Sequence, residues 1–155
     1  MPPFEIVDLN TLKEFEGREM PPTDWFVLTQ DRIQKFAEAT EDRQWIHMDA
    51  ERAARESPYG GTIAHGFLTL SLLSYLAAQA IRVCKGVGMR INYGLNRVRF
   101  PSAVRAGSAI RARMTLLSVK ESAQFVDVLF SMTIESQGAE KPCCVAEWLV
   151  RYYRA

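Results

Sequence analysis

The chain has 155 residues, of which 48% are hydrophobic, 24% are charged and 10% are aromatic, and its formal net charge is +1. These values are typical of one globular domain that is large enough to bury a core. The small net charge argues against a nucleic-acid partner. The first twenty residues contain acids throughout and no apolar run, which argues against a secretory signal peptide.

Charge is unevenly distributed along the chain. All 18 acidic residues lie in residues 1–56 or 121–155, whereas residues 57–120 carry nine lysines and arginines and no acid. Two interpretations fit this pattern. The middle third forms ion pairs with the flanking thirds across the fold, or it forms a basic rim around a site for an anionic ligand such as a phosphorylated carrier.

The three cysteines are Cys84, Cys143 and Cys144, an odd number without the spacing of a disulfide framework. We therefore expect reduced thiols and a cytoplasmic protein. Zinc is not expected, because the only histidines are His47 and His65 and the sequence contains no CxxC or HxxxH pattern.

The first forty residues predict two helices and one strand. Apolar residues over 7–17 indicate a short helix, which we group with a linker as the N-terminal segment 1–22. Residues 25–29 indicate a strand. Thr29 is expected to cap a helix over residues 30–40, which carries one apolar stripe.

Residues 41–49, "EDRQWIHMD", are expected to have irregular backbone. Asp42 and His47 are five residues apart, which places two side chains about 140° apart on a helix and on opposite faces of a strand. Only a bend brings this pair together, yet acid plus imidazole is the usual pair for proton transfer at neutral pH. Considered alone, Asp42 is also explained as a helix-end cap and His47 as a core imidazole. Asp49 is expected to cap a short helix over residues 50–56.

The segment Phe67–Ile81 carries no charge and is apolar on nearly every side. Such a helix is buried all round or lies in a membrane. It is shorter than the roughly 20 residues that a bilayer needs, so a helix wrapped by a sheet is the better interpretation, and no membrane partner is expected.

A glycine stands immediately before this helix, in "GGTIAHGF". Backbone N–H groups at a helix start are unpaired, and Gly66 has no side chain to keep a ligand away. This geometry suits a carbonyl oxygen that gains negative charge. Without further context, an ordinary helix start that needs glycine for packing is the simpler interpretation. His65 either packs in the core or lines the same cavity, and Ser74 hydrogen-bonds either a neighbouring backbone group or a substrate.

The rest of the sequence is rich in strand patterns separated by proline, glycine or polar breaks. One buried helix followed by a long antiparallel meander predicts an α+β fold, in which an antiparallel sheet wraps around the central apolar helix. This architecture is the hot-dog fold, expected as a single domain over residues 1–155. The predicted strands cover residues 89–94, 96–100, 108–119, 124–136 and 141–153.

The segments "FAEATEDRQWIHMD" and "GGTIAHGFLTLSLLS" together resemble the hydratase motif of the MaoC-like family, the R-specific enoyl-CoA hydratases. "QWIH" and "INYGLNRVRFP" are similar to the nodulation-protein-N-like branch. The resemblance covers most of the chain and is strongest over residues 25–101. It implies that Asp42 and His47 are the catalytic acid/base pair, that the Gly66 amide binds the thioester oxygen, and that Ser74 is a substrate-binding residue.

The resemblance implies an enzyme that adds water to a trans-2-enoyl-CoA to give a (3R)-hydroxyacyl-CoA, together with the reverse dehydration. It implies no metal and no cofactor beyond the coenzyme A of the substrate. We also expect a homodimer with each site at or near the subunit interface, because a single hot-dog unit exposes much of its sheet edge and an apolar helix end. An acyl-CoA thioesterase on the same fold is the alternative, but such thioesterases usually carry an acid on the central helix and residues 66–82 contain none. A non-catalytic acyl-thioester-binding protein is the third possibility.

Overall fold

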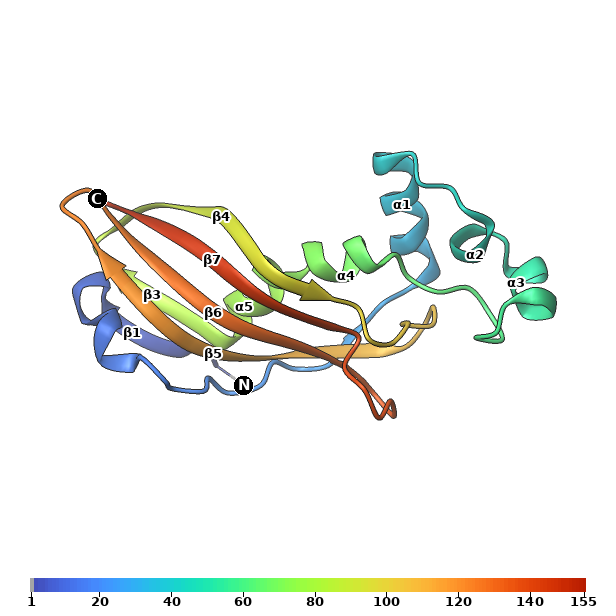
Figure 1. Ribbon diagram of the computed structural model, residues 1–155, viewed down its shortest axis with the longest axis horizontal. Helices are drawn as coiled ribbons and strands as arrows, with labels where there is room; N and C mark the ends of the chain where they lie inside the picture. The colour runs from blue at the N-terminus through green and yellow to red at the C-terminus, as the bar shows by residue number, and fades with distance from the viewer. Residues whose placement is uncertain (1) are drawn as a thin grey trace.

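A five-stranded antiparallel sheet curls around a helix, and three further helices lie beyond one end of the sheet (Figure 1). This computed structural model describes residues 2–155. The strands are β1 (Phe4–Asp8), β2 (Phe26–Val27), β3 (Ile81–Lys85), β4 (Val87–Arg99), β5 (Ala109–Glu121), β6 (Phe125–Ser136) and β7 (Cys144–Arg154). The helices are the 3-10 helix η1 (Leu9–Phe15), α1 (Gln30–Thr40), α2 (Trp45–Met48), α3 (Ala50–Glu56), α4 (Gly66–Ser71) and α5 (Leu73–Ala80).

The large sheet has the strand order β2-β5-β6-β7-β4. Buried and partly exposed residues alternate along β6 and β7, as expected for a sheet with one face on the core. The three long strands predicted after residue 107 are confirmed. The two short strands predicted over 89–94 and 96–100 are instead the single strand β4, because irregularities in its register with β7 bend the strand without ending it.

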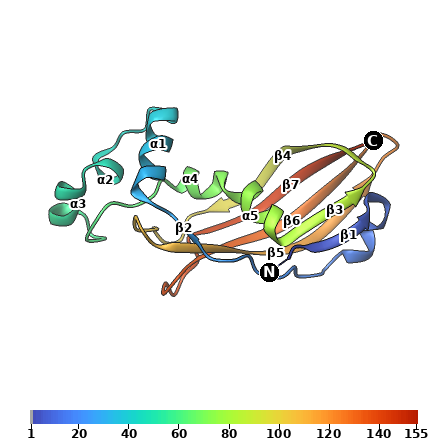
Figure 2. The ribbon, with the colours of Figure 1, turned by 180° about the vertical axis from the view of Figure 1, so that it is seen from behind.

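The central helix lies against the concave face of the sheet, as the view from behind shows (Figure 2). It is interrupted at Leu72, where Ser71 Oγ donates to the Leu68 carbonyl oxygen at 2.9 Å and competes with the helical hydrogen bonds. The expectation of burial on all sides was too strong, since Phe67 is 69% and Tyr75 is 49% exposed. The helix also ends at Ala80, so residue 81 begins a strand.

The N-terminal segment differs from the predicted helix over residues 7–17. Val7 belongs to β1, which pairs in parallel with β3, and the helical part is the 3-10 helix η1. Asp8 caps this short helix by accepting from the Asn10 amide, which explains why the turn begins two residues later than expected. The predicted segment 1–22 starts at Met1, which lies outside the described residues.

The helices before the sheet follow their capping signals. Thr29 caps α1 by accepting from the Arg32 amide, and Asp49 caps α3 by accepting from the Arg52 amide, so both predicted caps are confirmed. The region expected to be irregular contains one short helix, α2. Within this region, irregular backbone covers residues 41–44, between α1 and α2, and residue 49, between α2 and α3.

One edge of the sheet is covered by an extended segment, whereas the other edge is open. Residues 17–23 run along β5 beyond the short strand β2 and bond to it, for example through the Met20 amide and the Met114 carbonyl oxygen at 2.8 Å. Strand β4, at the opposite edge, pairs with β7 alone within the described chain. Three large apolar side chains of β4 are exposed: Met89, Tyr93 and Leu95.

The basic middle third contacts the flanking acids in part. Four of its arginines pair with carboxylates outside it, in the pairs Arg82–Glu5, Arg97–Glu147, Arg111–Glu135 and Arg113–Glu19. Arg99 and Arg105 donate instead to backbone oxygens of Val98 and Gly60. No helix in the described part of the chain has both the length and the apolar character needed to cross a membrane.

Candidate active site

A cavity of about 600 Å³ opens where the helices meet the end of the sheet. It lies at the first turn of α4, next to the loop that follows β4. Its lining joins segments that are far apart in the sequence and includes His47, Tyr59, Gly66, Phe100 and Cys143. Two of the four predicted site residues, His47 and Gly66, therefore line one cavity.

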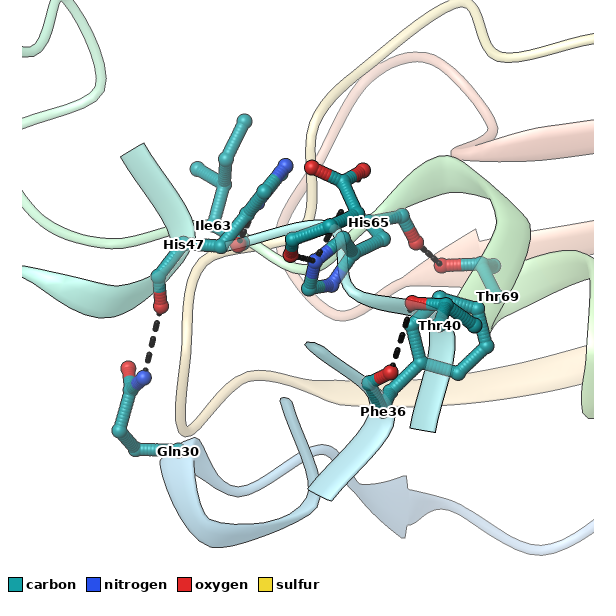
Figure 3. Close-up of polar contacts among 8 residues, drawn as sticks. Gln30, Phe36, Thr40, His47, Ile63, His65 and Thr69 are labelled. Atoms are coloured by element: carbon teal, nitrogen blue, oxygen red, sulfur yellow. Dashed lines mark hydrogen bonds and ion pairs between the residues drawn. The ribbon is translucent and has the colours of Figure 1, made fainter. Parts of the chain in front are cut away.

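His47 is buried and its imidazole is fixed on one side by the backbone. Its Nδ1 lies 2.7 Å from the Ile63 carbonyl oxygen (Figure 3). Because a carbonyl oxygen only accepts, Nδ1 carries the proton of the neutral ring and Nε2 has a free lone pair. The neutral ring can therefore accept a proton at Nε2.

Gln30, the first residue of α1, holds α2 in place. Its Nε2 donates to the His47 carbonyl oxygen at 2.7 Å, and its Oε1 accepts from Thr62 Oγ1 at 2.5 Å. The Ile63 amide also donates to the Ile46 carbonyl oxygen at 3.1 Å. Two segments, the start of α1 and the chain at Ile63, thus fix the short helix that carries His47, and the Thr62 hydroxyl orients Gln30 between them.

His65 lies against His47, with ring centroids 3.8 Å apart and an interplanar angle of 26°. Its Nε2 lies 2.9 Å from the backbone carbonyl oxygen of Asp42 and 4.0 Å from the Asp42 carboxylate. The Phe36 ring contacts the same imidazole at a centroid distance of 5.0 Å. His65 is therefore packed between the residues that the sequence singled out.

Asp42 reaches the site because the chain turns sharply after α1. Glu41 takes a left-handed conformation with φ of 61°, which ends the helix and redirects the next residue. A carboxylate oxygen of Asp42 and one nitrogen of each of His47 and His65 then lie within 4.8 Å of one another. The side chain of Asp42 remains 54% exposed.

Burial lowers the pKa of His47 below its ordinary value of 6.5, and the neighbouring His65 acts in the same direction. The hydrogen bond to Ile63 and the negative charge of Asp42 oppose this shift. Because burial is the largest effect, the neutral form of His47 is favoured at neutral pH. A neutral imidazole is the form that acts as a base.

Gly66 is the first residue of α4, so its amide has no partner within the helix. A Cβ at this position would lie 3.0 Å from two ring atoms of Phe100, Cδ2 and Cγ. Any larger residue would therefore displace the ring or the helix start. The absence of a side chain leaves the amide accessible beside the cavity.

Ser74 lies elsewhere. It lines a second, mainly apolar cavity of about 350 Å³ between the central helix and β4, and its Oγ donates to Asn92 Oδ1 at 3.2 Å. The edge-to-face pair of Phe67 and Phe100, with centroids 6.1 Å apart, links the two cavities, because Phe67 lines the second and Phe100 the first. The structure thus brings Asp42, His47 and Gly66 together and leaves Ser74 apart.

The same three groups raise the question of a metal ion, since Asp42, His47 and His65 offer one acid and two imidazoles. Two nitrogens already face backbone carbonyl oxygens. The two ring planes are 26° apart, so their remaining lone pairs lie in two nearly parallel planes, whereas a bound cation needs ligands that converge on one point. The arrangement fits proton transfer better than cation binding.

Sequence reasoning did not assign the positions of Gln30 and Phe100 or the stacking of His65. The family that the sequence resembles usually has Asn-Pro where this chain has Gln44-Trp45, and the structure places Gln44 at the N-cap of α2 without a side-chain cap. Trp45 instead lies under the Arg52 guanidinium at 4.3 Å from the ring centroid. Gln44-Trp45 thus occupies the N-cap and first helical positions, where Asn and Pro are favoured.

Comparisons with known proteins agree with this architecture. Residues 13–137 match the family model described as "MaoC like domain". A 3-hydroxyacyl-thioester dehydratase Z of Mycobacterium tuberculosis is 50% identical over 137 residues, which cover 88% of this chain and 89% of that protein. Nodulation protein N of Rhizobium leguminosarum bv. viciae is 42% identical over 134 residues, which cover 86% of this chain and 83% of that protein.

Solved structures show the same fold. The (R)-hydratase from A. caviae involved in PHA biosynthesis has a TM-score of 0.68 at 22% identity, and the match covers 87% of this chain and 94% of the hydratase chain. The R-hydratase PhaJ1 from Pseudomonas aeruginosa has a TM-score of 0.69 at 24% identity, and the match covers 87% of this chain and 79% of the PhaJ1 chain. The predicted hot-dog fold is confirmed.

Proposed function

The chain belongs to the MaoC-like dehydratase family, and we propose that it is a hydro-lyase that adds water to trans-2-enoyl-CoA, giving (3R)-hydroxyacyl-CoA, and catalyses the reverse dehydration. Family membership agrees with the resemblance seen in the sequence. The relative named 3-hydroxyacyl-thioester dehydratase supports the class of reaction for this chain. The R stereochemistry and coenzyme A as carrier are the finer parts of the proposal.

The observation that carries the proposal is the convergence of Asp42 and His47 within 4.8 Å. One water that accepts or donates at about 2.8 Å on each side spans up to about 5.6 Å between two groups. A single water therefore fits between the carboxylate and the imidazole. Positioned acid–base groups of this kind typically contribute about 10²–10⁴-fold to a rate.

The chemistry follows from this placement. Asp42 and His47 hold the water, and a proton passes to the pair as the water oxygen bonds to C3 of the enoyl thioester. Negative charge builds on the thioester oxygen, where the free amide of Gly66 stabilises the enolate. The pair then returns a proton to C2, so water is added across the double bond from one side. No step needs a metal or a redox cofactor.

The substrate's two ends fit the two kinds of surface beside the site. Its acyl chain would pass the Phe67–Phe100 pair into the mainly apolar cavity that contains Ser74. Its phosphates would approach Arg99 and Arg105, which flank the cavity-lining residues 100–104 and pair with no carboxylate among the described residues. This assignment gives Ser74 a role near the acyl chain.

We also propose a homodimer that forms through β4. This strand is 13 residues long, lies at the open edge of the sheet and exposes Met89, Tyr93 and Leu95. An uncovered edge strand of this length is a ready surface for pairing with a second copy. Light scattering after size exclusion should give twice the chain mass, and Leu95→Lys should shift the protein towards the monomer.

One assay tests the reaction. Crotonyl-CoA is added, and the loss of enoyl absorbance is followed together with the release of free thiol. Hydration without thiol release supports the proposal, thiol release would indicate the thioesterase, and the absence of both would indicate a binding protein. Chiral chromatography of the hydrolysed product should give the 3R acid.

The variants Asp42→Asn and His47→Gln connect the reaction to the site. Each should lower kcat by about 10²-fold or more while the melting temperature stays close to that of the wild type. Asp31→Asn is the matched control, because this carboxylate is exposed and pairs with Lys35 on α1. Full activity of either site variant would contradict the mechanism.

A further inference from the structure

His65 contacts each part of the proposed site, although the mechanism above gives it no role. It is the N-cap residue of α4, directly before Gly66. Its ring stacks on His47, and its Nε2 bonds to Asp42. One buried side chain, only 3% exposed, therefore links the acid, the imidazole and the helix start.

The bond to Asp42 is the strongest part of this argument. Nε2 of His65 lies 2.9 Å from the Asp42 carbonyl oxygen, which can only accept, so Nε2 carries a proton. Within the described part of the chain, His65 is the single hydrogen-bond partner of Asp42. The adjacent contacts are an exposed ion pair between Glu41 and Arg43 and a local backbone bond between the same residues. The position of Asp42 therefore depends on His65.

The contact between His65 and His47 restricts the tilt of the His47 ring. The Ile63 carbonyl oxygen holds one edge of the His47 ring, and this single bond still allows the ring to tilt. Stacking against His65 at 3.8 Å removes that freedom. Figure 3 shows His65 beside His47, with the Thr69 hydroxyl donating to the His65 carbonyl oxygen. His65, which orients the His47 ring, is thus held in place by a residue of α4.

The second ring nitrogen of His65 distinguishes positioning from a simple packing role. Nδ1 is buried and has no hydrogen-bond partner among the described residues. A residue selected for packing alone would not need an imidazole, because an apolar ring would avoid this uncompensated polar atom. The imidazole is explained by what its other nitrogen does for Asp42.

We propose that His65 is a positioning residue that sets the distance between Asp42 and His47, acting as the Nε2–H tautomer. It does not touch the reacting atoms. This inference rests on the proposed hydration reaction for its kinetic consequences, whereas the tautomer is independent of any activity. The two histidines then have opposite tautomers, with the proton on Nδ1 in His47 and on Nε2 in His65.

Nitrogen-15 spectra of the imidazoles test the tautomers directly, since the chain contains only two histidines. Protein labelled with ¹⁵N-histidine should show one Nδ1–H and one Nε2–H ring, and His65→Gln assigns them by removing the second. A His65 signal of the Nδ1–H form would overturn the proposal. A signal that shifts on addition of Zn²⁺ at protein-equivalent concentration would also overturn it, in favour of a metal ligand.

Two substitutions separate the donor from the ring. His65→Gln keeps an N–H near the place of Nε2 and should lower kcat for crotonyl-CoA by less than about tenfold. His65→Phe keeps a flat ring without the donor and should lower kcat by about 10²-fold, the cost of a misplacement near 1 Å, while KM stays within about threefold. A kcat of His65→Phe within twofold of the wild type would overturn the proposal.

A double-mutant cycle shows whether His65 acts through Asp42. In an Asp42→Asn background, His65→Phe should cost much less than it costs in the wild type, because the group that it positions has already been disabled. Equal losses in the two backgrounds would mean that His65 acts otherwise and would overturn the proposal. An Asp42→Asn protein with full activity would instead contradict the proposed function, whatever the tautomer of His65.

Discussion

Nδ1 of His47 lies 2.7 Å from the carbonyl oxygen of Ile63. This contact assigns the proton of the neutral ring to Nδ1 and leaves Nε2 available as a base. Ile63 is itself held by bonding to α2 and lies next to the residues that pair with the loop after β4, as in the 2.8 Å bond from the Ala64 amide to the Val104 oxygen. The base is therefore oriented by backbone on two sides of the cavity.

The first prediction concerns the pH dependence of activity. Burial lowers the pKa of His47, so its base form persists below the ordinary imidazole value of 6.5. We expect the acid limb of kcat/KM for crotonyl-CoA to have its midpoint below about 6.5. Initial rates in buffers of constant ionic strength measure it. A midpoint above this value would contradict the assignment of His47 as a buried base.

The second prediction concerns stability and follows from the same shift. The folded state has the lower His47 pKa, so the unfolded state binds more protons between the two values. The free energy of unfolding should therefore decrease as pH falls from about 6.5 through the lowered pKa. Urea denaturation at a series of pH values measures this slope. His47→Gln removes the titrating group and should flatten the slope over that window.

The third prediction concerns the close approach of Gly66 to Phe100. A Cβ on residue 66 would lie 3.0 Å from Cγ of the ring, which is near the backbone and cannot swing far away. Gly66→Ala should therefore shift the start of α4 and lower kcat/KM by about 10²-fold. Phe100→Leu in the same chain should recover part of the loss by making room. Phe100→Leu alone is the control, and an unaffected Gly66→Ala protein would show that the ring yields.

The fourth prediction concerns the thiols. Burial raises the pKa of Cys143 to about 12 and that of Cys144 to about 11, whereas Cys84 is exposed. Cys143 lines the cavity, yet its Sγ donates to the Ile134 oxygen at 3.2 Å. Iodoacetamide at pH 8 should label Cys84 alone in the native protein and all three cysteines in denaturant. Rapid native labelling of Cys143, detected by peptide mass, would contradict this.

Local signals in the sequence predicted a large part of the fold. Thr29 and Asp49 have the side chains that cap helices, and proline, glycine or polar breaks marked the limits of the three long strands, so these elements could be assigned without tertiary information. The interruption at Leu72 and the joining of two short strands into β4 depend on side-chain bonding and register with β7. No local pattern encodes those contacts.

Three residues of the candidate site could be predicted from the sequence, whereas Gln30, Phe100 and the arrangement of the site could not. Asp42, His47 and Gly66 were singled out from their residue types and from the resemblance. The spacing of five residues gave no distance, because convergence depends on the left-handed turn at Glu41. The stack of His65 on His47 joins residues 18 positions apart, so only the folded chain reveals it.

The last prediction tests that turn. Glu41 adopts φ of 61° and ψ of 10°, a conformation that costs most L-residues about 1–2 kcal/mol and that asparagine tolerates better. Its exposed ion pair with Arg43 contributes little in compensation. Glu41→Asn should therefore raise the free energy of unfolding by roughly 0.5–1 kcal/mol and leave kcat within about twofold. Glu41→Val is the opposing variant, because a β-branched residue resists this conformation; it should lower both stability and kcat by displacing the neighbouring Asp42. Urea denaturation and the crotonyl-CoA assay measure both variants, and a Glu41→Val protein with normal kcat would show that the turn does not control the position of the acid.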